Sequence, residues 1–281
     1  MAVRIITDTA ADFELQESKE KGITIVPLSL TYGTENLLDT YEIDKATFYH
    51  RLLDEKEIPM TSQPSPERVQ QEFEKAKEAG DSVVAILISS ALSGTVQSAM
   101  LAKQICDYDE IYIVDSLSAI AGMRILVDVA LDMAKQGKSA AEIAEKLETL
   151  KGRIRIRAGV DTLEYLYKGG RLSRTEAGLG TLANIKPLLQ VTPEGKVTVL
   201  SKCIGRKRAL RQLVEHLQEM EVDQEYPMYY IYSAEKENCL KLQEMMESNG
   251  QLNNCRGMVE LGPTIGTHVG GGAYGMVFIE K

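Results

Sequence analysis

The sequence has no tryptophan, four phenylalanines and three histidines among its 281 residues. So few large aromatic side chains leave little material for a platform on which nucleic-acid bases stack. Basic residues are the minority, because 41 Asp and Glu against 32 Lys and Arg give a formal net charge of −9. A general nucleic-acid binder normally has the opposite sign. We therefore expect no nucleic-acid partner, and polyanion binding could rest only on a local basic patch.

A long hydrophobic run is also missing. The longest uninterrupted apolar stretch, Val83 to Ile88, has six residues, whereas a helix needs about 20 to cross a bilayer. The N-terminal residues show no apolar region of the kind found in signal peptides. We expect a cytoplasmic protein with no transmembrane segment. The sequence is compatible with transient contact with a membrane.

The four cysteines, Cys106, Cys203, Cys239 and Cys255, form no CxxC pair. This spacing argues against a zinc site and against a redox dithiol, so we expect reduced and mostly buried thiols. No GxxxxGK[ST] or GxSxG motif is present. Gly270, Gly272 and Gly275 satisfy GxGxxG, but only six residues follow, too few for the helix of a dinucleotide-binding unit. We expect neither a metal nor a cofactor.

Strand and helix signals alternate in the first half. Strands are predicted at 3–7, 82–88 and 111–114, with a further strand signal at 23–30 that Pro27 interrupts. Helices are predicted from Ser65-Pro66 to Gly80, from Ser93-Gly94 to about 105, and from about 119 to 136. This alternation is typical of a parallel α/β sheet covered by helices.

The pattern changes near residue 150, after a helix that the capping box Ser139–Glu142 opens. Residues 153–157 alternate as in an antiparallel strand, 188–192 and 196–201 form a hairpin signal, and 205–221 is an amphipathic helix. Two further strands are predicted at 227–233 and 275–280. We expect a parallel α/β domain at 1–150 and an α+β domain with a mixed or antiparallel sheet at 151–281, with the ligand between them.

Hydroxyl groups concentrate where the predicted strands of the first domain end. Residues 61–65 read Thr-Ser-Gln-Pro-Ser, and residues 89–95 read Ser-Ser-Ala-Leu-Ser-Gly-Thr. Ligands of open α/β sheets bind at the carboxyl ends of strands, where backbone amides favour an anion. These hydroxyls can be simple helix caps. Two such clusters that face one crevice, with Gly94 permitting a close approach, also suit an anionic ligand.

Three other residues attract attention. His268 lies in the glycine-rich segment 262–275, which we expect to enter the final strand, whereas we expect no functional role for His50 and His216. Arg171 follows Gly169-Gly170 and is expected at the surface. Arg206, with Lys207 and Arg208, begins a helix where positive charge is unfavourable, so an anionic partner is plausible there.

These blocks together resemble the DegV family of bacterial fatty-acid-binding proteins. The resemblance extends over nearly the whole chain and rests on six blocks in order, with an Asn-Ile-Lys-Pro run at 184–187 after the fifth: Ile6–Ala10, Thr61–Ser65, Ser89–Thr95, Val114–Ser116, Asp161–Arg171 and Ile265–His268. The chain departs from the family at Val269 and Gly271, where the family usually has Thr and Pro.

The resemblance implies two α/β domains that clamp a long-chain fatty acid and present its carboxylate to a separate ATP-dependent kinase subunit. The product would be an acyl phosphate for phospholipid synthesis, and the chain itself would be non-catalytic. By position, Thr61, Ser93 and His268 match the carboxylate-binding residues, while Arg171 and Arg206 match positions linked to kinase docking or phosphate handling.

A rival hypothesis is a serine hydrolase of acyl esters. Ser93 would be the nucleophile, His268 the base, and Asp8 or Asp115 the residue that orients the base. A lipid sensor that uses the same pocket is a third possibility.

Overall fold

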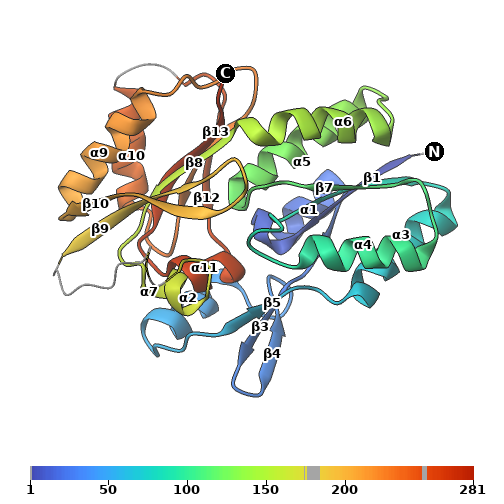
Figure 1. The fold of residues 1–281 in the computed structure, drawn as a ribbon, viewed down its shortest axis with the longest axis horizontal. Helices are drawn as coiled ribbons and strands as arrows, with labels where there is room; N and C mark the ends of the chain where they lie inside the picture. Colours follow the sequence, from blue (N-terminus) through green and yellow to red (C-terminus); the bar gives the residue numbers. More distant parts are fainter. Residues whose placement is uncertain (1, 174, 176–183, 249–251) are drawn as a thin grey trace.

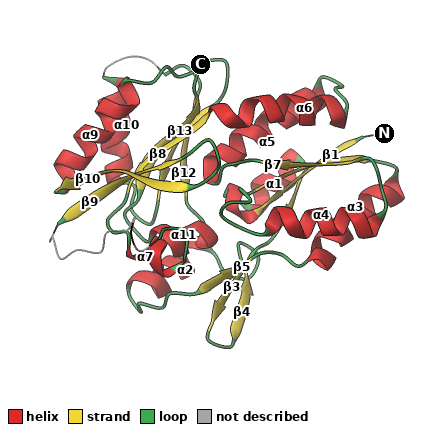
Figure 2. Cartoon of the chain, in the orientation of Figure 1, coloured by secondary structure: helices red, strands yellow, loops and turns green. Residues whose placement is uncertain are grey.

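The structure is a computed structural model that describes residues 2–173, 175, 184–248 and 252–281. Figures 1 and 2 show two large sheets with helices packed against them, and a small three-stranded sheet at the bottom of the view. Within the described ranges, no helix combines the length and the apolar character needed to cross a bilayer.

The first sheet is parallel throughout and has the strand order β2-β1-β6-β7. Its strands are β1 (Val3–Asp8), β2 (Ile23–Val26), β6 (Ser82–Leu87) and β7 (Ile111–Asp115). Every residue of β6 is buried. Helices cover both faces of the sheet, which explains why the sequence of this strand is apolar without alternation.

Helices α3 (Pro66–Ala79) and α4 (Thr95–Cys106) pack on one face of this sheet, and α5 (Ile120–Lys135) and α6 (Ala140–Leu150) pack on the other. The predicted starts of two helices are confirmed. Ser65 accepts a hydrogen bond from the Arg68 amide at the start of α3, and Ser139 and Glu142 form the capping box of α6. Helix α1 (Leu15–Lys21) lies next to β2.

The second sheet is mixed, because only β11 and β12 run parallel in the order β10-β9-β8-β13-β11-β12. Its strands are β8 (Ile154–Gly159), β9 (Ile185–Val191), β10 (Val197–Ile204), β11 (Met228–Tyr232), β12 (Cys255–Glu260) and β13 (Tyr274–Ile279). Strands β9 and β10 form the predicted hairpin. Helices α9 (Arg206–Gln218) and α10 (Glu237–Glu247) cover one face around Leu213, Leu242 and Phe278.

Helix α5 packs between the two large sheets. It contacts β1 and β6 on one side and β8, β11 and β13 on the other, and all its residues from Ile120 to Val127 are buried. A single hydrophobic cluster extends through it from Val84 to Val277. The proposed domains 1–150 and 151–281 would therefore share one core.

The small sheet is antiparallel and consists of β3 (Ser29–Tyr32), β4 (Glu35–Leu38) and β5 (Met60–Ser62) in the order β4-β3-β5. Pro27 divides the predicted strand at 23–30 between β2 and β3. Helix α11 (Pro263–Val269) contacts both α2 (Lys45–Leu53) and α7 (Glu164–Lys168) beside this sheet. Two short 3-10 helices, η1 (Thr9–Ala11) and η2 (Lys151–Arg153), complete the described elements.

The glycine-rich segment enters β13 as expected, but it also contains helix α11, which the sequence did not predict. Pro263 occupies the first helical position, where its missing N–H leaves no bond unmade. The amides of Gly266 and Gly270 then donate to the carbonyls of Gly262 and Gly266. The density of glycine hides this helix from a reading of local propensity, since glycine disfavours helices.

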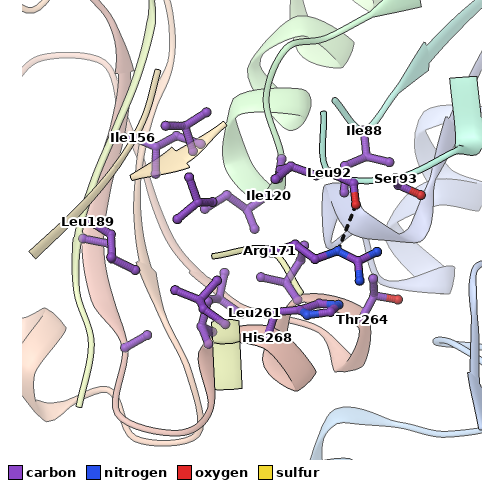
Figure 3. Close-up of a pocket in the computed structure, with 18 of the residues that line it drawn as sticks. Ile88, Leu92, Ser93, Ile120, Ile156, Arg171, Leu189, Leu261, Thr264 and His268 are labelled. Carbon is purple, nitrogen blue, oxygen red and sulfur yellow. Dashed lines mark hydrogen bonds between the residues drawn. The ribbon is translucent and has the colours of Figure 1, made fainter. Parts of the chain in front are cut away.

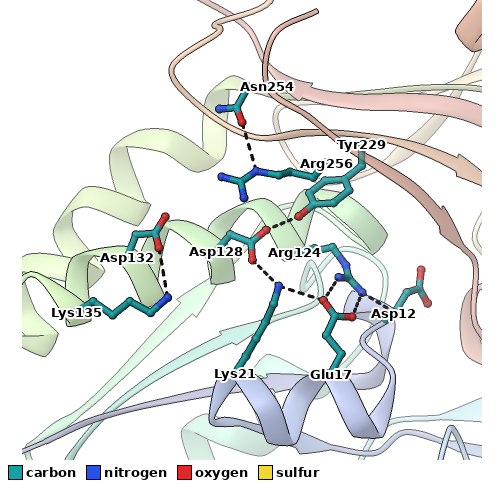
Figure 4. A network of polar contacts seen from close by, with 10 residues as sticks. All are labelled: Asp12, Glu17, Lys21, Arg124, Asp128, Asp132, Lys135, Tyr229, Asn254 and Arg256. Atoms are coloured by element: carbon teal, nitrogen blue, oxygen red, sulfur yellow. Dashed lines mark hydrogen bonds and ion pairs between the residues drawn. The ribbon is translucent and has the colours of Figure 1, made fainter.

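A network of polar side chains joins α1, α5 and β11 (Figure 4). Arg124 of α5 donates to the two carboxylate oxygens of Glu17 at 2.6 and 2.9 Å, and to the backbone carbonyl of Asp12 at 3.0 Å. Asp128, one turn along α5, accepts a hydrogen bond from the Tyr229 hydroxyl of β11. The buried positive charge of Arg124 is thus balanced within the chain.

Two buried aspartates hold the start of α11. Asp12 accepts from the Gly262 amide at 2.8 Å, and Asp39 accepts from the Thr264 amide at 3.1 Å and from its hydroxyl. Burial raises the pKa of both carboxyl groups, that of Asp12 to about 7. These contacts set the position of the helix that carries His268.

The pKa of Asp12 predicts how stability depends on pH. Because the folded pKa of about 7 exceeds the usual 3.8, the stability linked to this group is complete below the usual pKa and is lost as pH rises through 7. Asp12→Asn keeps an acceptor for the Gly262 amide and removes the titration. We expect its free energy of unfolding, measured in urea, to fall less than that of the wild type between about pH 4 and pH 8. An unchanged slope would contradict this.

Candidate functional site

A cavity lies between the two large sheets, beside the first residues of α5 (Figure 3). Its lining is mostly apolar and comes from both halves of the chain. The apolar residues are Leu28, Ile88, Leu92, Ala119, Ile120, Ile156, Ala158, Val160, Leu166, Leu189, Val191, Val197, Ile231, Leu261, Ile265, Val269 and Ala273.

The two sides of this cavity differ in polarity. Figure 3 shows Ser93, Arg171 and His268 on one side, and Ile156 and Leu189 on the other. A cavity with one polar side and a long apolar remainder suits an amphiphile that has a single head group and an apolar tail.

Thr61 and His268 are in direct contact although 207 residues separate them: Thr61 Oγ1 lies 2.8 Å from His268 Nε2. Strand β5 holds Thr61 through its pairing with Leu30 of β3, and His268 lies in the last turn of α11. His268 Nδ1 has no hydrogen-bond partner among the described residues. It faces Gly169, where a β-carbon would collide with the imidazole.

The imidazole of His268 is neutral. Burial and the neighbouring charge of Arg171 lower its pKa to about 3. The neutral ring carries one proton, and an unpaired buried N–H is less well tolerated than an unpaired lone pair. This favours the proton on Nε2, which then donates to Thr61, so the Thr61 hydroxyl proton is available to an acceptor in the cavity.

Ser93 and Gly94 lie between β6 and α4. Ser93 lines the cavity, and its Oγ is 2.9 Å from Thr95 Oγ1. Gly94 precedes the first residue of α4 and does not line the cavity. The close approach that Gly94 permits is made by the Gln63 side chain, which would collide with a β-carbon there and which donates to Ser98 Oγ.

Arg171 lies in the cavity wall and is half-buried, although the sequence predicts a surface position. Its Nε donates to the Leu92 carbonyl at 3.0 Å, and its Nη1 donates to the Gly169 carbonyl at 2.6 Å. Burial lowers the pKa of the guanidinium. Among the residues that the structure describes, no carboxylate pairs with it. A half-buried cation in this position suits an anion supplied from outside the chain.

Arg206 occupies a different place and does not line the cavity. It donates to the two carboxylate oxygens of Asp161 at 2.9 and 2.7 Å, and Lys186 also pairs with Asp161, at 2.9 Å. Asp161 therefore supplies the negative charge that balances the basic residues at the start of α9. Lys207 and Arg208 are exposed.

The β9–β10 hairpin forms one wall of the cavity through Leu189, Val191 and Val197. At its tip, the Gly195 carbonyl accepts a hydrogen bond from Ser89 Oγ at 3.0 Å. Ser89 belongs to the loop after β6, so this contact ties a wall from the second half of the chain to the first half.

The structure does not assemble the hydrolase triad. His268 contacts Thr61 through Nε2 and has no partner at Nδ1. Asp8 accepts from the amides of Ala10 and Ile88, and Asp115 accepts from those of Ser90 and Leu117. Within the described residues, neither aspartate orients His268, so nothing here favours this alternative.

The departures at Val269 and Gly271 have a structural counterpart. Val269 adds to the apolar lining, and His268 is held by Thr61 of another element. At Gly271, a β-carbon would meet the end of the Leu53 side chain.

Sequence reasoning did not identify Thr264, which lines the cavity and whose position is fixed by its hydrogen bonds to Asp39. The position of Thr264 within the glycine-rich segment 262–275 was the feature of the sequence that could have identified it.

Other titratable groups lie elsewhere. His50 contacts Asp54, and His216 contacts Glu219. The four cysteines are free thiols, three of them buried, as predicted. The described part of the chain contains no cluster of His, Cys, Asp and Glu that could hold a metal ion.

Comparison with known proteins gives a consistent picture. The family model described as "Uncharacterised protein, DegV family" matches residues 2–281. A DegV domain-containing protein of Caldanaerobacter subterraneus is 34% identical over 280 residues, 99% of each chain. A fatty-acid-binding DegV family protein from Thermus thermophilus matches with a TM-score of 0.88 and 30% identity over the full length of both chains. A stearic-acid-binding protein from Eubacterium ventriosum matches with a TM-score of 0.87 and 26% identity, covering 100% of this chain and 99% of its own.

The low pKa of His268 predicts that its ring stays neutral between about pH 5 and pH 8. Because the folded pKa of about 3 lies below the usual 6.5, the stability linked to this group is complete above 6.5 and is lost as pH falls toward 3. The ¹⁵N shifts of the ring should not titrate in that range, whereas those of the protein unfolded in urea should. A folded midpoint near 6 would show that the ring is open to water.

Proposed function

The chain belongs to the DegV family, and from that premise we propose that it binds a long-chain fatty acid and presents its carboxylate to a separate ATP-dependent kinase. The observation that carries this proposal is the cavity between the two sheets, which is mostly apolar and has Ser93, Arg171, His268 and its partner Thr61 on one side. The related DegV family protein from Thermus thermophilus binds a fatty acid, which also supports the proposal.

The apolar part of the cavity supports tight retention of the tail. Burying about 15 methylenes at ~0.8 kcal/mol each contributes a gross ~12 kcal/mol, before the costs of association are subtracted. The walls are formed by packed strands and helices, so little of this free energy is needed to order them.

The polar side supports binding of the head group. The Thr61 hydroxyl can donate one hydrogen bond, because the neutral His268 ring already donates to its oxygen. Ser93 can donate another, and Arg171 supplies the positive charge that lacks a carboxylate partner within the described residues. Hydrogen bonds to a charged group contribute about 1.5–3 kcal/mol each.

The reaction that follows is phosphoryl transfer. A carboxylate oxygen of the fatty acid forms a bond to the γ-phosphorus of ATP while the bond to the ADP oxygen breaks, which gives an acyl phosphate for phospholipid synthesis. The kinase binds ATP, and this chain contributes no catalysis of its own and needs no cofactor. Arg206 lies outside the cavity, and we propose that it contacts the kinase. Because ATP is the phosphoryl donor in this reaction, we propose that the carrier works in the cytoplasm.

Lipid retention tests the assignment. We expect protein purified from a bacterial host to release a long-chain fatty acid on organic extraction, identified by mass spectrometry. Thr61→Val removes the hydroxyl and keeps the shape, so it should weaken binding of the fatty acid roughly tenfold. Thr31→Val, on the neighbouring strand β3, is the matched control and should bind as the wild type does. An extract without fatty acid, together with no measurable binding, would rule the carrier out.

The apolar side of the cavity is expected to limit the length of the acyl chain that fits. Leu189 faces the cavity on the side away from Ser93, so Leu189→Phe should shorten the available space. We expect the extracted lipids to shift toward shorter chains, and stearate to lose more affinity than myristate. Leu200→Phe changes the same hairpin on its opposite face, where Leu200 packs against another cluster, and it should leave the lipid profile unchanged. Equal profiles in both variants would place the tail elsewhere.

A further inference from the structure

The Thr61–His268 pair separates the interior cavity from a groove on the surface. This outer groove is lined by Ile58, Pro59, Met60 and Lys168, and it shares Thr61, Arg171 and His268 with the cavity. The same three side chains therefore face the ligand on one side and the groove on the other. A molecule that acts on a carboxylate held at Thr61 can reach it through this groove.

The rim of the outer groove is apolar and exposed. Met60 is 74% exposed and Ile58 is 38% exposed, whereas Pro59, between them in the chain, is buried. Met60 immediately precedes Thr61 in β5. Methionine is common on surfaces that bind partner proteins, because its flexible side chain adapts to them.

The floor and surroundings of the groove differ in charge. Arg171 in the floor has no carboxylate partner among the described residues, while Lys168 on the rim pairs with Glu164 at 2.6 Å. Before the rim, Asp54, Glu55 and Glu57 outnumber Lys56 in the chain, and Glu57 pairs with Arg51 at 2.8 Å. An anionic group fits the floor, whereas an anionic lipid surface would be repelled by this acidic loop and by the net charge of −9.

We propose that Ile58 and Met60 form the docking surface for the protein that donates the phosphoryl group, which reaches the carboxylate along the outer groove. This inference rests on the proposed function and adds to it the place where the partner binds. The apolar rim contacts the partner protein, and the transferred phosphoryl group passes Arg171.

The test uses the purified chain loaded with palmitate, the fatty acid kinase subunit from the same genome, and ATP. Acyl phosphate is trapped with hydroxylamine while the concentration of the loaded carrier is varied. Met60→Glu places a charge on the rim without touching the cavity. We expect it to raise the KM for the carrier at least about tenfold, with kcat and palmitate affinity unchanged, because it removes binding shared by the ground and transition states.

Met100→Glu is the matched control, since Met100 is 54% exposed on α4 and does not line the outer groove. It should behave as the wild type. The docking surface is overturned if Met60→Glu has a wild-type KM, or if the control loses as much. It is also overturned if Met60→Glu instead slows palmitate exchange with phosphatidylglycerol vesicles, because the rim would then face a membrane. If the loaded wild-type chain gives no acyl phosphate, the kinase part of the proposed function fails, and this inference fails with it.

Discussion

The packing of helix α5 between two sheets is the constraint on which the rest of the structure depends. A helix in that position must bury side chains all round, and the run from Ile120 to Val127 does so. The helix holds the sheets apart along its length, and beside its first residues the space between them stays open as the cavity. The site is therefore a gap in a shared core, which is why its walls come from both halves of the chain.

The two arginines Arg124 and Arg171 differ in how their positive charge is balanced. Arg124 is buried and its charge is matched by Glu17, so this pair ties α5 to α1 within the first half of the chain. Arg171 is half-buried and bonded only to backbone carbonyls among the described residues. A protein pays for an unmatched buried charge in stability, and such a charge persists where a ligand supplies the counter-ion. The contrast between these two arginines supports the proposal that Arg171 binds an anionic ligand, whereas Arg124 has a structural role.

Local signals predicted much of this architecture. The capping box at Ser139, the cap at Ser65 and the buried run of β6 depend on neighbours in the sequence, and each is confirmed. The contact of Thr61 with His268 spans 207 residues, and only the resemblance to a family suggested it. Helix α11 was missed because tertiary contacts with Asp12 and Asp39 hold a segment whose glycines disfavour a helix. The place of Arg171 in the wall depends on the same long-range packing.

The cavity walls and the hydrophobic core are one cluster, since Ile88, Ile120, Ile156 and Leu189 belong to both. An acyl chain in the cavity would thus complete the interior of the protein as well as occupy a site. Ligand that binds only the folded state raises its stability by an amount that grows with ligand concentration. The supply of fatty acid in a cell would then govern how often the chain opens to proteases. Abundance of the carrier would follow abundance of its cargo, with no regulator other than mass action.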